Sequence, residues 1–288
     1  MAKCWGPRVY SILGGAHFSI STSKGPLHLG HYTSHVTELQ LVTRETILAV
    51  DIGATTIKFG VVDADGHLID DVVRMPTPYP CSPRRLIEFI AEWIELSGCS
   101  RVGVGFPGDL REGLVVEPGN LSRPQGFTSE IDPSLNELWR NTNLEEAFRS
   151  ASHQDVRVVN DATLAALGCS EGTGNELVFT LGTGFGIALV VDGAVIKIRD
   201  VGAEIFFEGW SYDRRLGEFA RSQDEERWNA LLAMAVENFV AEFSADIVHL
   251  GGGNSRRVDL TLFSNSSYRV VVNDNDVTLR GAVKLFDR

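Results

Sequence analysis

The chain has few cysteines, no long apolar run and no excess of basic residues. Its four cysteines, Cys4, Cys81, Cys99 and Cys169, form no CxxC pair, so neither a disulfide framework nor a structural zinc site is indicated. No apolar segment approaches the roughly 20 residues that cross a bilayer. With 26 Lys and Arg against 38 Asp and Glu, the net charge of −12 argues against a nucleic-acid partner. We therefore expect a cytoplasmic protein with neither membrane nor nucleic acid as partner.

Residues 1–45 differ from the rest of the chain. They hold four of the seven histidines and show no sustained helical or strand period, so we interpret them as a poorly ordered extension. A secretory leader is the alternative, but its apolar core, Val9–Leu13, is short and ends at two glycines. A third possibility is a natural start later than Met1, near Val42. The segment Pro26–Tyr32 resembles the HIGH motif of class I aminoacyl-tRNA synthetases, yet no KMSKS-like segment follows, and we interpret the match as chance.

Two glycine-rich turns, each between apolar strand-like runs, give the strongest signal. They are Asp51-Ile-Gly-Ala-Thr-Thr-Ile-Lys58 and Thr180-Leu-Gly-Thr-Gly-Phe-Gly186. Glycines serve any tight hairpin, but they also let backbone N–H groups approach a phosphate without a Cβ in the way. Between the turns, an apolar run ends in Asn160-Asp161. Two phosphate cradles and a carboxylate are typical of phosphoryl transfer, because that chemistry consists mainly of positioning and charge neutralisation.

The same order of strands and helices is predicted in both halves. The first half has strand patterns at 47–51, 57–63 and 67–74, a helix over 82–97 that starts at Ser82-Pro83, and a strand over 101–106. The second half has a short helix over 162–167, strands over 176–181 and 187–191, a helix over 224–243 and a strand over 246–250. This α/β pattern of duplicated βββαβ halves predicts a two-lobed, actin-like (ribonuclease-H-like) fold, with lobes at 46–159 and 160–288.

From Thr46 onward the motifs resemble, in order, those of the ROK family of sugar kinases, and most closely its polyphosphate/ATP glucokinase branch. Six segments carry the resemblance: 51–58, Gly103–Gly108, Asn120-Leu121, 159–161, 181–186 and Leu250–Gly253. The family's Glu-x-Gly-His segment is matched by Glu204-Ile-Phe-Phe207, which keeps the acid and lacks the histidine. The family's cysteine-rich zinc loop is also missing, as in the polyphosphate branch. Ala54 stands where family members usually have Gly.

The resemblance implies transfer of a phosphoryl group from ATP or polyphosphate to a hexose, with glucose as the expected acceptor. Asp161 is the candidate general base, because a sugar hydroxyl loses its proton as it attacks phosphorus; the alternative is an ordinary helix N-cap. Asn120, Asn160 and Glu204 are the expected sugar contacts. Asp51 is the candidate Mg²⁺ ligand. The expected phosphate and nucleotide contacts are Asp51, Gly53, Thr55, Lys58, Thr180, Gly182, Thr183, Gly184, Gly251 and Gly252.

Two other readings stay open at this stage. Phe206-Phe207 in place of Gly-His suggests a catalytically impaired sugar-binding regulator or pseudokinase of the ROK type. An acetate-kinase-like or exopolyphosphatase-like relative would share the glycine turns but fits Gly103–Gly108 and Asn160-Asp161 less well. The sequence does not decide between ATP and polyphosphate as donor. A homodimer is implied by the resemblance alone.

Overall fold

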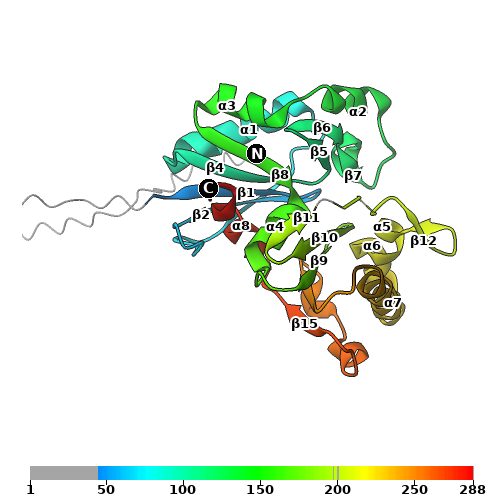
Figure 1. Cartoon of the computed structure of the whole chain (residues 1–288). Helices are drawn as coiled ribbons and strands as arrows, with labels where there is room; N and C mark the ends of the chain where they lie inside the picture. Colours follow the sequence, from blue (N-terminus) through cyan, green and yellow to red (C-terminus); the bar gives the residue numbers. More distant parts are fainter. Residues whose placement is uncertain (1–44, 197, 200, 288) are drawn as a thin grey trace, which may run out of the picture. The chain divides into compact units, whose positions relative to one another are not determined.

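A computed structural model describes residues 45–196, 198, 199 and 201–287 (Figure 1). The predictions for residues 1–44, which include the extension, the leader and the HIGH-like segment, lie outside the described residues. No helix within the described ranges is both long and apolar enough to cross a membrane.

The first half forms a five-stranded sheet. Its strands are β1 (Ile47–Ile52), β2 (Thr56–Val62), β3 (Val73–Pro76), β4 (Arg101–Phe106) and β8 (Asp155–Asn160), in the order β3-β2-β1-β4-β8. β1, β2 and β3 pair antiparallel, whereas β4 and β8 run parallel to β1. The strand predicted over 67–74 is wrong in its bounds, because β3 begins at Val73. Asp70 and Asp71 precede it, and Asp is disfavoured in strands.

The second half repeats this sheet. It contains β9 (Asn175–Leu181), β10 (Phe185–Val191), β11 (Ala194–Ile196), β14 (Ile247–Gly251) and β15 (Arg269–Val272), in the order β11-β10-β9-β14-β15. One helix precedes the parallel strand in each half: α1 (Pro83–Ser97) before β4 and α7 (Glu225–Phe243) before β14. The duplicated βββαβ plan is therefore confirmed.

Capping residues that are recognisable in the sequence lie at the ends of these two helices. The Ser82 hydroxyl accepts the Arg85 N–H at the start of α1, and Gly98 ends the helix with a φ of 67°, a left-handed conformation that glycine adopts without strain. At the start of α7, Asp224 accepts the Arg227 N–H in the same way.

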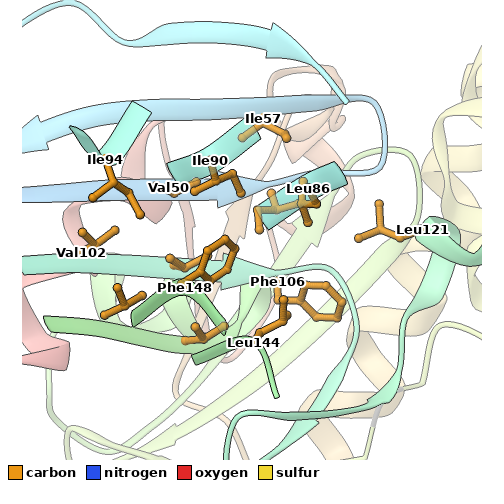
Figure 2. Close-up of a cluster of buried hydrophobic side chains, with 14 of the residues drawn as sticks. Val50, Ile57, Leu86, Ile90, Ile94, Val102, Phe106, Leu121, Leu144 and Phe148 are labelled. Carbon is orange, nitrogen blue, oxygen red and sulfur yellow. The ribbon is translucent and has the colours of Figure 1, made fainter. Parts of the chain in front are cut away.

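Apolar side chains of the helices cover the first sheet. Figure 2 shows Leu86, Ile90 and Ile94 of α1 above the strands, with Val50 and Val102 in the same cluster. All five side chains are fully buried or nearly so. Burial of apolar surface stabilises the folded state by about 25 cal/mol per Å². This packing therefore keeps the strands, and the turns at their ends, in fixed positions.

Two long connections carry elements that the sequence pattern did not reveal. Between β4 and β8 lie β5 (Asp109–Arg111), β6 (Leu114–Glu117), η1 (Gly119–Ser122), β7 (Pro124–Phe127), α2 (Pro133–Arg140) and α3 (Leu144–Ser152). Between β11 and α7 lie β12 (Ile205–Phe207), β13 (Trp210–Ser211), α5 (Tyr212–Leu216) and α6 (Glu218–Gln223). Outside these two connections, the part of the chain after β14 adds four short helices besides β15: η2 (Ser255–Arg257), η3 (Leu260–Phe263), α8 (Val277–Arg280) and η4 (Val283–Leu285).

The helix α4 (Asp161–Cys169) lies between the two sheets. Leu164 packs in a cluster with Ile47 of β1, in the first sheet, and Leu279 of α8. The small residues Ala162, Ala165 and Ala166 pack against β9 and β10 on the other side. A helix buried on both sides is apolar all round. The lobe boundary predicted at 159/160 stays a prediction, since α4 contacts both sheets and α8 returns to the first.

Candidate active site

A cleft of about 1080 Å³ is lined by residues of both halves of the fold. The carboxyl end of β1, the start of α4 and the turn between β9 and β10 all open into it. Of the residues proposed from the sequence, those that line it are Asp51, Gly53, Thr55, Lys58, Asn120, Asn160, Asp161, Thr180, Gly182, Thr183, Gly184 and Gly252. Glu204 and Gly251 are not among the lining residues.

The two glycine turns meet across this cleft. The hydroxyl oxygens of Thr55 and Thr183 are 3.1 Å apart, although 128 positions separate them in the sequence. A Cβ on Gly53 would lie 2.7 Å from the Thr56 carbonyl oxygen, so this turn requires glycine. Beside Gly182, by contrast, nothing lies within 4 Å of where a Cβ would be. A phosphate can therefore approach the backbone at Gly182 closely.

Asn160 and Asp161 stand where β8 ends and α4 begins. The Asn160 side chain caps α4: its oxygen accepts the N–H groups of Ala162 at 2.9 Å and Thr163 at 3.3 Å. Its amide nitrogen donates to the Gly108 carbonyl at 3.0 Å. Asp161 is the first helical residue, and its Oδ1 accepts the Ala162 N–H at 2.7 Å. The alternative that Asp161 is the N-cap is wrong, because Asn160 holds that position.

Asp51 and Lys58 form an ion pair at the first turn. Lys58 Nζ lies 3.0 Å from Asp51 Oδ2 and donates to the Asn275 carbonyl at 2.7 Å. Both side chains are mostly buried. Mg²⁺ is usually held by one or two carboxylates together with substrate phosphates. Asp51, a carboxylate in the cleft beside the first glycine turn, fits that requirement.

Tyr79 and Thr77 support the first turn from behind, and sequence reasoning missed both. The Thr77 hydroxyl donates to the Gly53 carbonyl at 2.7 Å, and the Tyr79 hydroxyl to the Ala54 carbonyl at 2.8 Å. The Tyr79 oxygen also lies 3.4 Å from the Asn120 carbonyl oxygen. Burial, with Cys81 nearby, raises the pKa of Tyr79, so the hydroxyl remains a donor at neutral pH. Ala54 has no positive φ, so its methyl adds no backbone strain.

Asp213 supports the second turn, and sequence reasoning missed it too. Its Oδ1 accepts the Phe185 N–H at 2.7 Å. A Cβ on Gly184 would lie 2.5 Å from the same oxygen, so the close approach requires glycine there. No sequence pattern marks Asp213, because its partner stands 28 positions away.

The Glu204-Ile-Phe-Phe207 segment lies beside the cleft rather than in its lining. Glu204 accepts from Arg199 Nε at 2.8 Å, and Arg199 does line the cleft. Phe206 stacks on Tyr212 with ring centroids 4.5 Å apart. Phe206 and Phe207 both pack against the second core. The phenylalanines therefore leave the cleft open, and the sugar contact of Glu204 stays a prediction.

The Gly251–Gly253 run follows β14. Gly251 is buried and pairs with Thr180 of β9. Gly252 has a φ of 84°, and a Cβ there would lie 2.4 Å from the Leu181 carbonyl oxygen. Asn254 Nδ2 lies 3.3 Å from the Gly182 carbonyl oxygen. The run thus packs against the second glycine turn, and Gly252 and Gly253 line the cleft.

Comparison with known proteins identifies a matching family and a relative of known name. The model of the ROK family matches residues 47–203. The polyphosphate glucokinase of Mycobacterium leprae is 28% identical over 236 residues, which are 75% of this chain and 66% of that protein. The chain thus spans just under two thirds of that relative's length.

Two solved structures are similar to the described fold. The inorganic polyphosphate/ATP-glucomannokinase from Arthrobacter sp. strain KM has a TM-score of 0.70 and 28% identity, covering 83% of this chain and 97% of its own. A ROK family glucokinase from Streptomyces griseus, solved with glucose and AMPPNP, has a TM-score of 0.62 at 17% identity, again over 83% of this chain and 97% of its own. At that identity, the second likeness shows the fold alone.

Proposed function

The chain belongs to the ROK family, and from this premise we propose that it is a sugar kinase. It transfers the terminal phosphoryl group of ATP or polyphosphate to a hexose hydroxyl, and glucose is the expected acceptor. One observation carries the proposal. The two glycine turns meet at Thr55 and Thr183, 3.1 Å apart, in the cleft that also holds Asp161.

The carboxylate of Asp161 acts as the general base. A hexose hydroxyl placed beside it loses its proton as its oxygen attacks the terminal phosphorus, and the bond to the leaving phosphate oxygen breaks in line. The capping bonds of Asn160 fix the start of α4 and so orient Asp161. Because Asn160 already uses its side chain in this way, its proposed sugar contact adds to a structural role. Asn120 precedes Leu121, whose fully buried side chain fixes the backbone there. Of the two asparagines, Asn120 is the one whose side-chain amide is not used to cap a helix.

The donor lies between the two turns in this proposal. The open space beside Gly182 lets its phosphates approach the backbone of the second turn closely, and Lys58 adds positive charge. Asp51 would hold Mg²⁺, which would supply charge neutralisation at the phosphates. The relatives' names include both polyphosphate and ATP, so both donors belong to the proposal. A cytoplasmic location and a homodimer are proposed on the family resemblance.

A sugar-binding regulator is the second candidate, because the family histidine is replaced by Phe207. A missing partner for a sugar hydroxyl weakens binding by about 1–3 kcal/mol, which is about one to two powers of ten in affinity. This loss is compatible with either function. The phenylalanines do not obstruct the cleft, and Asp161 and both glycine turns are present, so we favour the kinase.

Coupled phosphorylation assays decide between the two candidates. The full chain is tested with a panel of hexoses and with ATP or polyphosphate, alongside Asp161→Asn. We expect the variant to lose about 10²–10⁴-fold in kcat, the usual contribution of a general base, while glucose still binds in a calorimetric titration. If the unaltered chain consumes no more of either donor than Asp161→Asn does, and still binds sugar, it is a regulator and not a kinase.

A further inference from the structure

A second hollow, of about 300 Å³, is lined mainly by residues of α5, α6 and α7 and shares no lining residue with the cleft. We call it the arginine hollow, after Arg214, Arg215 and Arg227, which line it together with Trp210 and Phe219. None of the residues proposed for catalysis, sugar or donor binding lines it. The α5 and α6 segment forms a common wall, because Asp213 and Glu218 line the cleft while their neighbours Arg214 and Phe219 line the hollow. Figure 1 shows α5, α6 and β12 next to α7.

Aromatic rings hold two of these guanidinium groups in place. The Arg214 guanidinium lies 5.6 Å from the centre of the Trp210 ring and 5.0 Å from that of Phe219. Arg215 lies 5.9 Å from both Phe207 and Trp210. These are cation–π distances. The rings are therefore engaged with arginine, and the polar groups that the hollow offers to a ligand are the N–H groups at the guanidinium edges.

The hollow carries an excess of positive charge in a chain whose net charge is −12. One oxygen of Glu208 serves two arginines, with Arg215 Nη2 at 2.5 Å and Arg227 Nη2 at 2.7 Å. Asp224, the acid that lines the hollow, accepts the Arg227 N–H at the start of α7. Among the described residues, Arg214 has no carboxylate partner. Three arginines thus line the hollow with one lining acid, Asp224, and Arg214, which is exposed, is left to bind an anion.

We propose that the arginine hollow binds the distal part of a polyphosphate chain whose reacting end lies in the cleft. The proposal rests on the sugar-kinase function above and identifies the donor. Guanidinium forks match phosphate oxygens in pairs. A chain of phosphates offers oxygen atoms at every unit, so it can engage more than one of these guanidinium groups at once.

The common wall lets a long donor reach both places. A helix with its side chains is roughly 10 Å across, so a donor that occupies both places must extend at least that far, which a polymer does and the three phosphates of a cleft-bound ATP do not. The acids on the cleft side of the wall have partners. Glu218 forms two hydrogen bonds to Arg221, at 2.8 Å each, and Asp213 accepts the Phe185 N–H. These contacts reduce the repulsion between the two carboxylates and the phosphates of a bound polyphosphate.

The test is the full-length Arg214→Gln/Arg227→Gln double variant, in which both substituted side chains are exposed. KM and kcat for glucose phosphorylation are measured with long-chain polyphosphate, tripolyphosphate and ATP. We expect the KM for long-chain polyphosphate to rise about tenfold, as for the loss of charged hydrogen bonds, with kcat within about twofold. The KM values for tripolyphosphate and ATP should stay within about twofold. Arg84→Gln, an exposed arginine of α1 paired with Glu88, is the matched control and should change none of these values.

An unchanged KM for long-chain polyphosphate, or an equal rise with all three donors, overturns the inference. A binding assay separates this failure from failure of the proposed function. Fluorescently labelled long-chain polyphosphate is titrated with the unaltered chain and with the double variant at about 0.15 M salt, where weak surface charges are screened. A tenfold weaker affinity of the variant supports the hollow even if no sugar is phosphorylated. Equal affinity, or no binding to either chain, overturns it.

Discussion

Asn160 shows how a single amide fixes the most important carboxylate of the cleft. Its oxygen caps α4, and its nitrogen holds the Gly108 carbonyl at the end of the neighbouring strand. An N-cap of this kind stabilises a helix by about 1 kcal/mol. The cap residue directly precedes Asp161, so the same bonds that start the helix also place the proposed base.

Tyr79→Phe tests the support behind the first glycine turn. The variant removes the donor to the Ala54 carbonyl and leaves that acceptor without it, at a cost of about 1–3 kcal/mol. We expect a lower unfolding free energy in urea and also a KM for the phosphoryl donor that rises severalfold, because the turn loosens.

The matched control is Tyr268→Phe, since the Tyr268 hydroxyl donates to Glu237 at 2.6 Å and does not line the cleft. This control should lose stability while its donor KM stays unchanged. Equal kinetic constants for Tyr79→Phe and the unaltered chain would show that the hydroxyl only stabilises the fold.

At the scale of elements, a buried carboxylate–histidine contact joins two neighbouring strands of the second sheet. Glu176 of β9 and His249 of β14 are almost completely buried, with 2.8 Å between Oε2 and Nε2. The carboxylate of Glu176 also accepts the N–H groups of Glu171 at 2.8 Å and Gly172 at 2.7 Å. Burial by itself would raise the pKa of Glu176, but these N–H groups and His249 outweigh it and hold the pKa below its usual value.

Glu176→Gln should therefore lose stability in a pH-dependent way. Because the folded-state pKa lies below the unfolded one, the stabilisation is complete above the unfolded value, about 4.3. It is lost as the pH falls through the folded value. Urea unfolding at pH 7 should give a gap of about 1–3 kcal/mol between the unaltered chain and the variant, and the gap should shrink below about pH 4.

Glu171→Gln is the control, because that exposed side chain pairs with Arg269 at the surface. Such surface pairs contribute about 0–1 kcal/mol. A gap for Glu176→Gln that grows toward low pH would contradict the direction assigned to its pKa.

Elements with a strong apolar period and clear caps could be predicted from the sequence. α1 and α7 were predicted in this way, because Ser82 and Gly98 mark the two ends of α1 and Asp224 marks the start of α7. The connections over 107–154 and 201–224 could not be predicted, because their short helices and strands depend on packing against the two cores. Most of the predicted site residues line the cleft, since the glycine turns are local signals. Tyr79 and Asp213 were missed, because each acts on backbone groups that are distant in sequence.

At the scale of the whole fold, α4 joins the two sheets through a close contact with the C-terminal helix α8. A Cβ on Gly168 would lie 2.0 Å from the Val277 carbonyl oxygen, and one on Gly281 would lie 2.0 Å from the Leu164 carbonyl oxygen. Both obstacles are backbone atoms, which cannot rotate away. The contact therefore sets the distance between α4 and α8, and with it the position of Asp161 relative to both glycine turns.

Gly168→Ala tests this contact, because helix propensity and packing predict opposite signs. Propensity alone favours alanine over glycine in a helix by about 1 kcal/mol, whereas overpacking at a fixed contact costs about 1–3 kcal/mol or more. A 2.0 Å approach to a carbonyl oxygen requires the helices to separate, so we expect packing to prevail. Urea unfolding should show a less stable variant, and kcat should fall more than the sugar KM rises, because Asp161 stands at the other end of α4. If Gly168→Ala is instead more stable and fully active, the two helices can separate without disturbing the cleft, and the lobes are held in place by other contacts.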